Sequence, residues 1–224
     1  MDSCFIANQQ IRAEFAALGA ELRRFQTIQG PDLLWSGDPA VWGRTSPVLF
    51  PIVGQLQGDI LRRDGREFPM ERHGFARDRV FSLVRLSRES CTWRLRDDEQ
   101  SRAQFPFAFE LWITYSVEGH RLTAMYEVRN PGTEPLPASL GAHPAFRWPL
   151  PGAEAEVHRI EFPRDESAPI SRLSEGFLDP HPYPNPVDGR VLRLMDGLFA
   201  QDALVFDRLE SRALRYLAPG APGL

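Results

Sequence analysis

The sequence contains no lysine, and this absence removes several kinds of catalytic site. All 26 basic residues are arginine. A Schiff-base lysine, a lysine general base and the lysine of a P-loop are therefore excluded. The 30 acidic residues bring the formal net charge to -4. We expect no nucleic-acid partner, because the phosphates of a nucleic acid attract a positively charged surface.

Cysteine and long hydrophobic runs are also scarce. Cys4 and Cys91 are the only cysteines, too few for a disulfide framework or a cysteine-based zinc site, so we expect two reduced and mostly buried thiols. The longest apolar stretch, residues 47–53, has about seven residues, far below the roughly 20 that cross a bilayer. The first residues lack the basic and apolar regions of a secretory signal. These features predict a cytoplasmic protein without a membrane partner.

Short alternating runs of apolar and polar residues dominate the chain, and helical periodicity is rare. The predicted strands cover residues 4–8, 11–16, 21–27, 33–35, 80–86, 91–96, 107–117, 120–129, 136–140, 191–194 and 203–206. The Glu-Gly pair at 118–119 is typical of a tight hairpin, and residues 38–40 predict one short helical turn. In 120–129, alternate residues predict a half-buried strand. Proline-dense residues 149–190 predict a long ordered loop. We therefore predict a single all-β domain over residues 1–224, with two large packed antiparallel sheets.

Common catalytic motifs are missing. The sequence has no G-x-G-x-x-G, no Walker A motif and no G-x-S-x-G, and no two histidines stand at zinc-protease or cupin-like spacing. We predict no metal site. What remains are two histidines in unusual local settings.

His73 lies in Arg72-His-Gly-Phe-Ala-Arg77. The glycine after it permits a close backbone approach, and the flanking arginines favour a neutral imidazole that can hydrogen-bond a hydroxyl. His143 lies in Gly-Ala-His-Pro-Ala-Phe, where the following proline favours an extended backbone that could direct the ring into a cleft. The alternatives are a surface-loop histidine at 73 and a core histidine at 143.

Arg44 lies between Trp42 and an apolar, proline-flanked run. A half-buried guanidinium in this setting needs acceptors, either a carboxylate or sugar hydroxyls. The alternative to sugar binding is a structural ion pair.

Taken together, these blocks resemble the aldose 1-epimerase (galactose mutarotase-like) family. Arg44-Thr-Ser-Pro-Val-Leu-Phe-Pro-Ile-Val-Gly, His73-Gly-Phe-Ala-Arg, Gly-Ala-His143-Pro-Ala-Phe and Phe199-Ala-Gln-Asp202-Ala-Leu-Val-Phe occur in the family order over essentially the whole chain. The branch they resemble most is the shorter bacterial group called lactose-operon X-like. This resemblance implies a large antiparallel β-sandwich.

The resemblance also implies a reaction, the interconversion of the α and β anomers of an aldose by acid–base ring opening, which needs no cofactor. It assigns His143 as the general acid and His73 as a second catalytic residue that hydrogen-bonds the sugar. Arg44, Arg77 and Asp202 are the implied substrate-binding residues. The partner is a small-molecule hexose or related aldose, and we expect a monomer or homodimer.

One element of the family pattern is absent. The family base is a glutamate near the C-terminus, in a Glu-Pro-Trp-like context in this branch, and no Glu-Pro-Trp occurs here. We expect the sequence to be a truncated form of a longer protein or to have lost the base, and therefore to be a poor catalyst. Glu127 and Glu110 are imaginable substitutes, with a cross-strand ion pair as the alternative for Glu127. Glu210 is expected in a solvated turn.

Three functions follow from these observations. The first is an aldose 1-epimerase-like isomerase that acts on a free sugar. The second is a carbohydrate-binding protein of the same fold that does not turn the sugar over. The third is a hexose-phosphate mutarotase, suggested by the arginine-rich stretch 62–88, because arginine binds phosphate in a bidentate manner.

Overall fold

The computed structural model describes residues 2–221 and 223–224. It divides into two compact units, Met1–Phe146 and Arg147–Leu224, and each unit is described by itself. The expectation of one domain over residues 1–224 stays a prediction. No helix in the described residues is long and apolar enough to cross a membrane.

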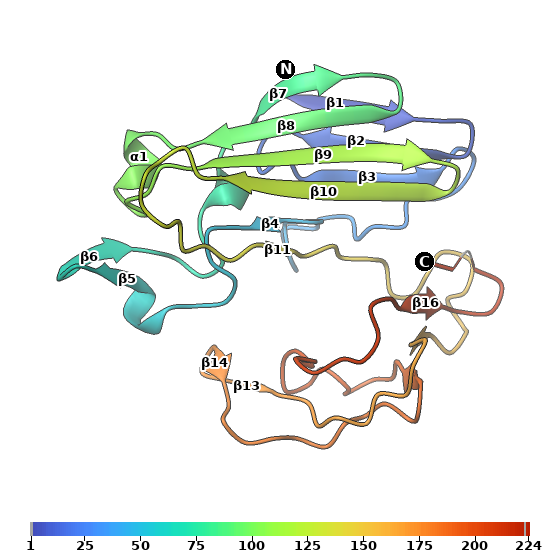
Figure 1. Cartoon of the computed structure of the whole chain (residues 1–224). Coiled ribbons are helices and arrows are strands. Elements are labelled where there is room, and N and C mark those ends of the chain that lie inside the picture. The colour runs from blue at the N-terminus through green and yellow to red at the C-terminus, as the bar shows by residue number, and fades with distance from the viewer. Residues whose placement is uncertain (1, 222) are drawn as a thin grey trace. The chain divides into compact units, whose positions relative to one another are not determined.

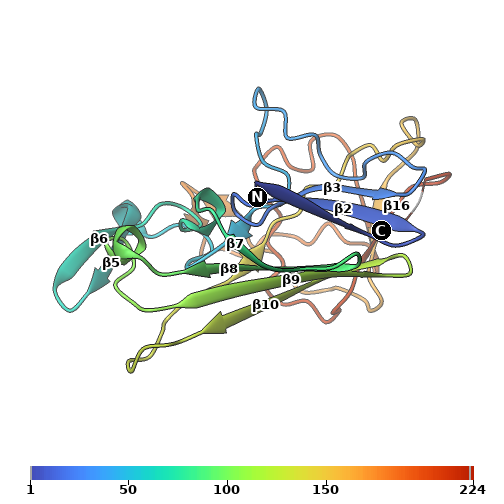
Figure 2. The same cartoon turned by 90° about the horizontal axis from the view of Figure 1, so that it is seen from above.

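Two antiparallel sheets form the main body of the first unit (Figure 1). The three-stranded sheet has the order β1 (Ser3–Ala7), β2 (Ile11–Ala16), β3 (Leu22–Thr27). The four-stranded sheet has the order β10 (Arg121–Arg129), β9 (Glu110–Glu118), β8 (Ser90–Arg96), β7 (Ser82–Leu86). Figure 2 shows the two sheets as separate layers. The all-β, antiparallel prediction is confirmed, and these strands begin and end within three residues of the predicted positions.

The core of the first unit lies between the two sheets and follows the two-residue period of the strands. In β2, Ile11, Ala13 and Phe15 are buried, and the residues that alternate with them are half-buried. In β9, Ile113 and Tyr115 are buried in the same alternating pattern. The rings of Phe15 and Tyr115 stack with centroids 4.2 Å apart, and both Cys4 and Cys91 are buried in this core as free thiols.

The edge strand β10 departs from the predicted half-buried pattern. Leu122 and Tyr126 are half-buried and pack against the core, but Ala124 is exposed and Val128 is 38% exposed. The reason is that β10 pairs with β9 on one side only, so its inward face is incompletely covered.

Smaller elements complete the first unit. They are β4 (Val48–Leu49) paired with β11 (Gly141–Ala142), β5 (Ile60–Arg63) paired with β6 (Arg66–Pro69), the 3-10 turns η1 (Gln57–Asp59) and η2 (Ala76–Asp78), and the short helix α1 (Glu99–Arg102). Residues 38–40 form the predicted turn, in which Val41 and Trp42 N–H groups donate to the Asp38 carbonyl.

Two predicted strands of the first unit are wrong. Residues 33–35 make only an isolated bridge between Leu34 and Phe146. Residues 136–140 are irregular, and the strand β11 begins at Gly141. Pro135 and Pro137 have no N–H group to give to a ladder, which explains why pairing starts only after them.

The second unit has shorter strands. Its three-stranded sheet has the order β15 (Val191–Arg193), β12 (Arg159–Glu161), β16 (Arg215–Leu217), and β13 (Leu173–Ser174) pairs with β14 (Phe177–Leu178). The strand predicted at 191–194 is therefore confirmed. The loop predicted over 149–190 is wrong in part, because it contains β12, β13 and β14. The strand predicted at 203–206 is also wrong, because only a single bridge, Ser171 to Val205, forms there.

Candidate functional site

Residues 44–54 form the central segment of the candidate site, and residues 139–145 run alongside it. The short ladder of β4 with β11 joins the two segments, as Figure 1 shows. Beyond the ladder, the His143 N–H donates to the Pro47 carbonyl at 3.2 Å and the Ala145 N–H donates to the Thr45 carbonyl at 2.8 Å. The backbone of His143 is therefore fixed by the segment that carries Arg44.

Residues 73–76 also contact the central segment. The N–H groups of Phe75 and Ala76 donate to the Phe50 carbonyl at 3.0 and 3.1 Å. A side chain at Gly74 is impossible here, because its Cβ would lie 2.3 Å from the Phe50 oxygen and its φ is +69°. The close approach expected from the glycine after His73 is therefore present, and it brings the backbone of His73 against the central segment.

His73 is held by two hydrogen bonds with Gly54. The His73 N–H donates to the Gly54 carbonyl at 2.7 Å, and the Gly54 N–H donates to Nδ1 of His73 at 3.0 Å. Because Nδ1 accepts this bond, the neutral ring carries its proton on Nε2. Neutral His73 is therefore a hydrogen-bond donor at Nε2 and has no free acceptor nitrogen.

The imidazole of His143 lies near two other rings. Its centroid is 5.3 Å from the Trp42 ring and 6.3 Å from the His73 ring. The residue His143 is more exposed to solvent than the half-buried His73, although its ring is partly buried. The two histidines come from blocks about 70 residues apart in the chain, and their rings lie near each other.

Arg44 and Arg77 share one carboxylate. Arg44 Nη2 donates to Asp78 Oδ1 at 2.6 Å, and Arg77 Nε lies 3.5 Å from Asp78 Oδ2. Arg44 Nη1 also reaches the Arg77 carbonyl at 3.4 Å, and Arg77 Nη2 donates to the Arg72 carbonyl at 2.7 Å. The structural ion pair considered for Arg44 therefore exists, with Asp78 as its partner.

Burial, together with nearby positive charges, lowers the pKa of both imidazoles. Burial is the main cause for His73, and the nearby Arg77, His143 and Arg72 add to it. For His143, burial of the ring and then Arg77 lower the pKa. The pKa of Arg77 is itself lowered by burial and by Arg44, and Asp78 opposes this shift. Since an ordinary histidine titrates near 6.5, both rings are mainly neutral at pH 7.

Asp202 belongs to the second unit. It has a positive φ of 67° and is exposed. Its Oδ1 accepts the Ala203 N–H at 2.7 Å, and its carbonyl accepts from Arg172 Nη1 at 3.2 Å. Its sugar-binding role stays a prediction.

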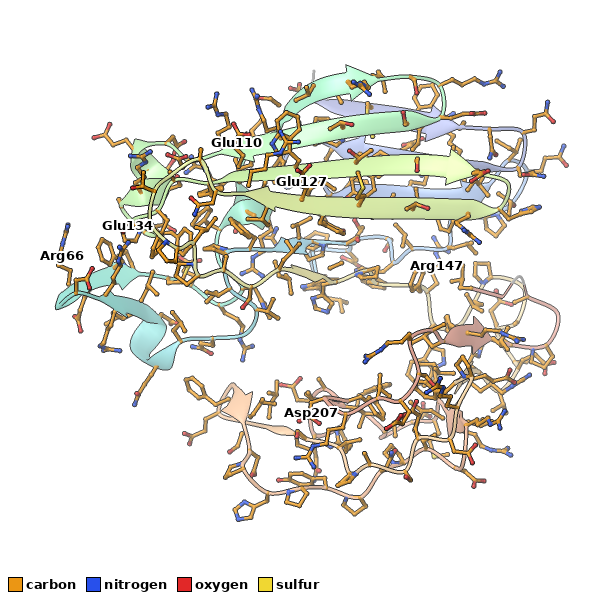
Figure 3. The ribbon with its side chains drawn as sticks, in the orientation of Figure 1. Arg66, Glu110, Glu127, Glu134, Arg147 and Asp207 are labelled. Atoms are coloured by element: carbon orange, nitrogen blue, oxygen red, sulfur yellow. The ribbon has the colours of Figure 1, made fainter. Side chains whose placement is uncertain are left out.

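The carboxylates considered as substitute bases are engaged elsewhere. Figure 3 labels Glu110 and Glu127 on the four-stranded sheet. Glu127 pairs with Arg129 of its own strand at 2.8 Å, and this contact lowers the pKa of Glu127. The predicted cross-strand ion pair is therefore wrong. The pair forms within the strand because alternate residues of one strand share a face. Glu110 pairs with Arg96 at 2.9 Å. Glu210 is exposed, as expected.

Sequence reasoning missed two residues that contact the site. Asp78 directly follows Arg77, and a carboxylate beside two candidate guanidinium groups is a signal that could have found it. Glu21 lies more than twenty residues before the central segment and carries no such signal. In the described residues, no group of three histidine, cysteine, aspartate or glutamate side chains is arranged to hold a metal ion.

Comparison with known proteins identifies the family of this chain. The model of the family described as aldose 1-epimerase matches residues 3–209. The protein belongs to the aldose 1-epimerase family.

Individual relatives support the same family. The chromosomal and plasmid forms of Protein LacX from Lactococcus lactis subsp. lactis are each 33% identical over 219 residues, covering 93% of this chain and 73% of the relative. A galactose mutarotase related enzyme from Lactobacillus acidophilus has a TM-score of 0.88 at 28% identity, over 97% of this chain and 73% of that one. A galactose mutarotase-like protein from Lactobacillus casei has a TM-score of 0.86 at 27% identity, over 97% and 76%. The fold is therefore galactose mutarotase-like.

Proposed function

We propose that this member of the aldose 1-epimerase family is a mutarotase that interconverts the α and β anomers of a free hexose. The observation that carries the proposal is the meeting of His73 and His143, 6.3 Å apart between ring centroids, beside the half-buried guanidinium groups of Arg44 and Arg77. This set of groups supplies hydrogen-bond donors and a titratable ring to a polyhydroxylated substrate. The proposed chemistry needs no cofactor.

Ring opening requires two proton transfers. A base takes the proton of the anomeric hydroxyl, and an acid protonates the ring oxygen as the bond from C1 to that oxygen breaks. Rotation about C1–C2 and reclosure then give the other anomer. We assign the acid to protonated His143, whose lowered pKa makes it a stronger acid but a minority form at pH 7. Neutral His73 donates from Nε2 to a sugar oxygen, and Arg44 is a permanently charged donor.

The base in this proposal is a water molecule. The resemblance assigns none of residues 1–224 to that role, and Asp78 is already paired with Arg44. With a water molecule as the base, the protein supplies the acceleration of one positioned acid, on the order of 10²- to 10⁴-fold.

Polarimetry on freshly dissolved α-D-glucose or α-D-galactose tests the proposal. We expect the approach to the anomeric equilibrium to accelerate in proportion to protein concentration. The acceleration should increase as the pH falls toward the lowered pKa of His143, because the protonated ring is the proposed acid. Rates equal to the spontaneous rate at every pH between 5 and 8 (roughly the range in which histidine titrates) would overturn the proposal.

A second candidate is sugar binding without turnover. The lowered pKa of His143 favours it, because a neutral imidazole at pH 7 is a poor acid. Trp42 lies 5.3 Å from His143, so a sugar bound at this place should change tryptophan fluorescence. Saturable fluorescence change without acceleration of anomerisation supports this second function.

The hexose-phosphate alternative is weakened at three arginines of the stretch 62–88. Arg62 pairs with Glu67, Arg63 with Glu134, and Arg79 with Asp98, so these guanidinium groups already have carboxylate partners. Comparing the binding of glucose with that of glucose 6-phosphate separates the two substrates. A preference for the free sugar that does not change with salt concentration excludes the phosphate alternative.

A further inference from the structure

A buried carboxylate next to the three-stranded sheet holds the central segment of the site. Glu21 is 4% exposed and directly precedes β3. Its Oε1 accepts the N–H groups of Thr45 at 2.6 Å and Ser46 at 2.9 Å, and it lies 3.0 Å from the Thr45 hydroxyl. Its Oε2 is 3.3 Å from Nη1 of Arg23. Three polar groups of residues 45–46 therefore converge on one oxygen.

This arrangement explains how the carboxylate is tolerated in the interior. A buried carboxylate is strongly unfavourable unless it is paired and hydrogen-bonded, and Glu21 has both kinds of partner. Thr45 and Ser46 lie outside the β4 ladder, which begins at Val48. Their N–H groups therefore depend on Glu21 as the acceptor. The Thr45 hydroxyl also lies 2.6 Å from the Leu22 carbonyl, which adds a second contact to the start of β3.

The segment that Glu21 holds fixes two of the candidate site residues. Arg44 directly precedes Thr45. The carbonyl of Thr45 accepts the Ala145 N–H at 2.8 Å, and the carbonyl of Pro47 accepts the His143 N–H at 3.2 Å. A displacement of residues 45–46 would therefore move both the guanidinium of Arg44 and the backbone that carries the His143 ring.

We propose that Glu21 is a positioning residue of the site. It sets the relative placement of Arg44 and His143 by accepting hydrogen bonds from the backbone of residues 45–46. It acts through that segment and contacts no substrate. Its effect on anomerisation rests on the proposed function, whereas its effect on the placement of His143 does not.

Two substitutions at Glu21 and one matched control test this proposal. Glu21→Ala removes the acceptor, whereas Glu21→Gln keeps an oxygen that can accept the same N–H groups. Asp97→Ala is the control, because Asp97 also accepts a backbone N–H, from Phe109 at 3.0 Å, and pairs with an arginine, Arg102, at 2.5 Å. The variants are compared by polarimetry and by NMR of the histidine ring protons, at a temperature where thermal unfolding shows all of them to be folded.

We expect Glu21→Ala to lower kcat on the order of 10²-fold, since small misplacements of catalytic groups have effects of this size. Glu21→Gln should restore most of kcat, and Asp97→Ala should leave it unchanged. The His143 ring resonances should shift in Glu21→Ala alone. Equal losses of kcat in the two alanine variants, or unchanged His143 resonances in Glu21→Ala, would overturn the proposal. If the unsubstituted protein does not accelerate anomerisation, the proposed function fails, and the NMR comparison alone decides the role of Glu21.

Discussion

The two units of the chain differ in the contacts that stabilise each of them internally. In the first unit, strands of up to nine residues bury alternate side chains in one continuous core, and Trp93 and Phe15 are almost fully buried there. In the second unit, no strand among the described residues is longer than three residues. Its core cluster is small and centres on Leu150 and Tyr216.

Side-chain contacts to the backbone replace long ladders in the second unit. The Asn185 amide donates to the carbonyls of Glu166 and Ala168 at 3.0 and 2.7 Å and accepts the Val187 N–H at 2.9 Å. Glu166 accepts the N–H groups of Glu210 and Ser211. The comparison teaches that a proline-rich segment can be ordered by a few buried or half-buried polar side chains, because these satisfy backbone groups that no neighbouring strand reaches.

The largest expected effect tests whether the chemistry belongs to the first unit. His143→Asn should reduce the rate of anomerisation on the order of 10²- to 10⁴-fold, or about 3 to 5 kcal/mol of barrier, with little change in sugar affinity, because an acid acts only as the ring opens. Polarimetry gives the rate and tryptophan fluorescence gives the affinity. Equal losses of rate and affinity would make His143 a binding residue.

Asp202→Asn tests whether the second unit contributes to sugar binding. If Asp202 holds sugar hydroxyls, the substitution should weaken affinity on the order of 10- to 100-fold and change kcat little, because a hydrogen bond to a charged group contributes about 1.5 to 3 kcal/mol. Fluorescence titration measures this change. An unchanged affinity would contradict the role assigned to Asp202.

The core of the first unit should be sensitive to loss of volume. Trp93→Ala removes a side chain with 0% exposure and should lower the free energy of unfolding by about 3 to 5 kcal/mol. Val41→Ala, at a side chain that is 75% exposed, is the control and should change it by less than about 0.5 kcal/mol. Denaturant unfolding measures both values, and a similar small loss in the two variants would contradict the assigned core.

The second unit should be sensitive to loss of one amide. Asn185→Ala leaves two backbone carbonyls and one N–H without their partner, and should cost about 1 to 3 kcal/mol of stability. Asn130→Ala is a matched control, because Asn130 makes similar contacts, to the Glu134 carbonyl and from the Gly132 N–H, but is exposed, so water can replace them. Amide hydrogen exchange measures the unfolding of the second unit and distinguishes the two variants.

The smallest expected effect is a pH dependence of stability in the first unit. The pKa values of His73 and His143 are lowered, mainly by burial, so the unfolded chain binds protons more readily than the folded one. Stability should therefore be fully present above the ordinary histidine pKa of about 6.5 and should fall as the pH drops below it. Denaturant unfolding between pH 5 and 8, roughly the range of histidine titration, measures the slope of the free energy of unfolding against pH. The double variant His73→Asn, His143→Asn should flatten this slope, and an unchanged slope would contradict the assignment.

The sequence by itself determined the all-β class and most strands of the first unit. Runs such as Ile11–Ala16 alternate with the period of a strand, and the Glu118-Gly119 pair marks the hairpin between β9 and β10. Both features act locally, so one sequence is enough to find them. The ordered motifs around Arg44, His73 and His143 likewise identified the family that the comparisons show.

Only the tertiary structure decided how these motifs are joined. Phe50 meets residues 74–76, and Pro47 meets His143, through contacts between segments far apart in the chain that leave no periodic signal. The structure also shows that Asp78 pairs with Arg44 and that Glu21 accepts the N–H groups of residues 45–46. A buried carboxylate is stable only where donors converge on it, and that convergence exists only once the chain has folded.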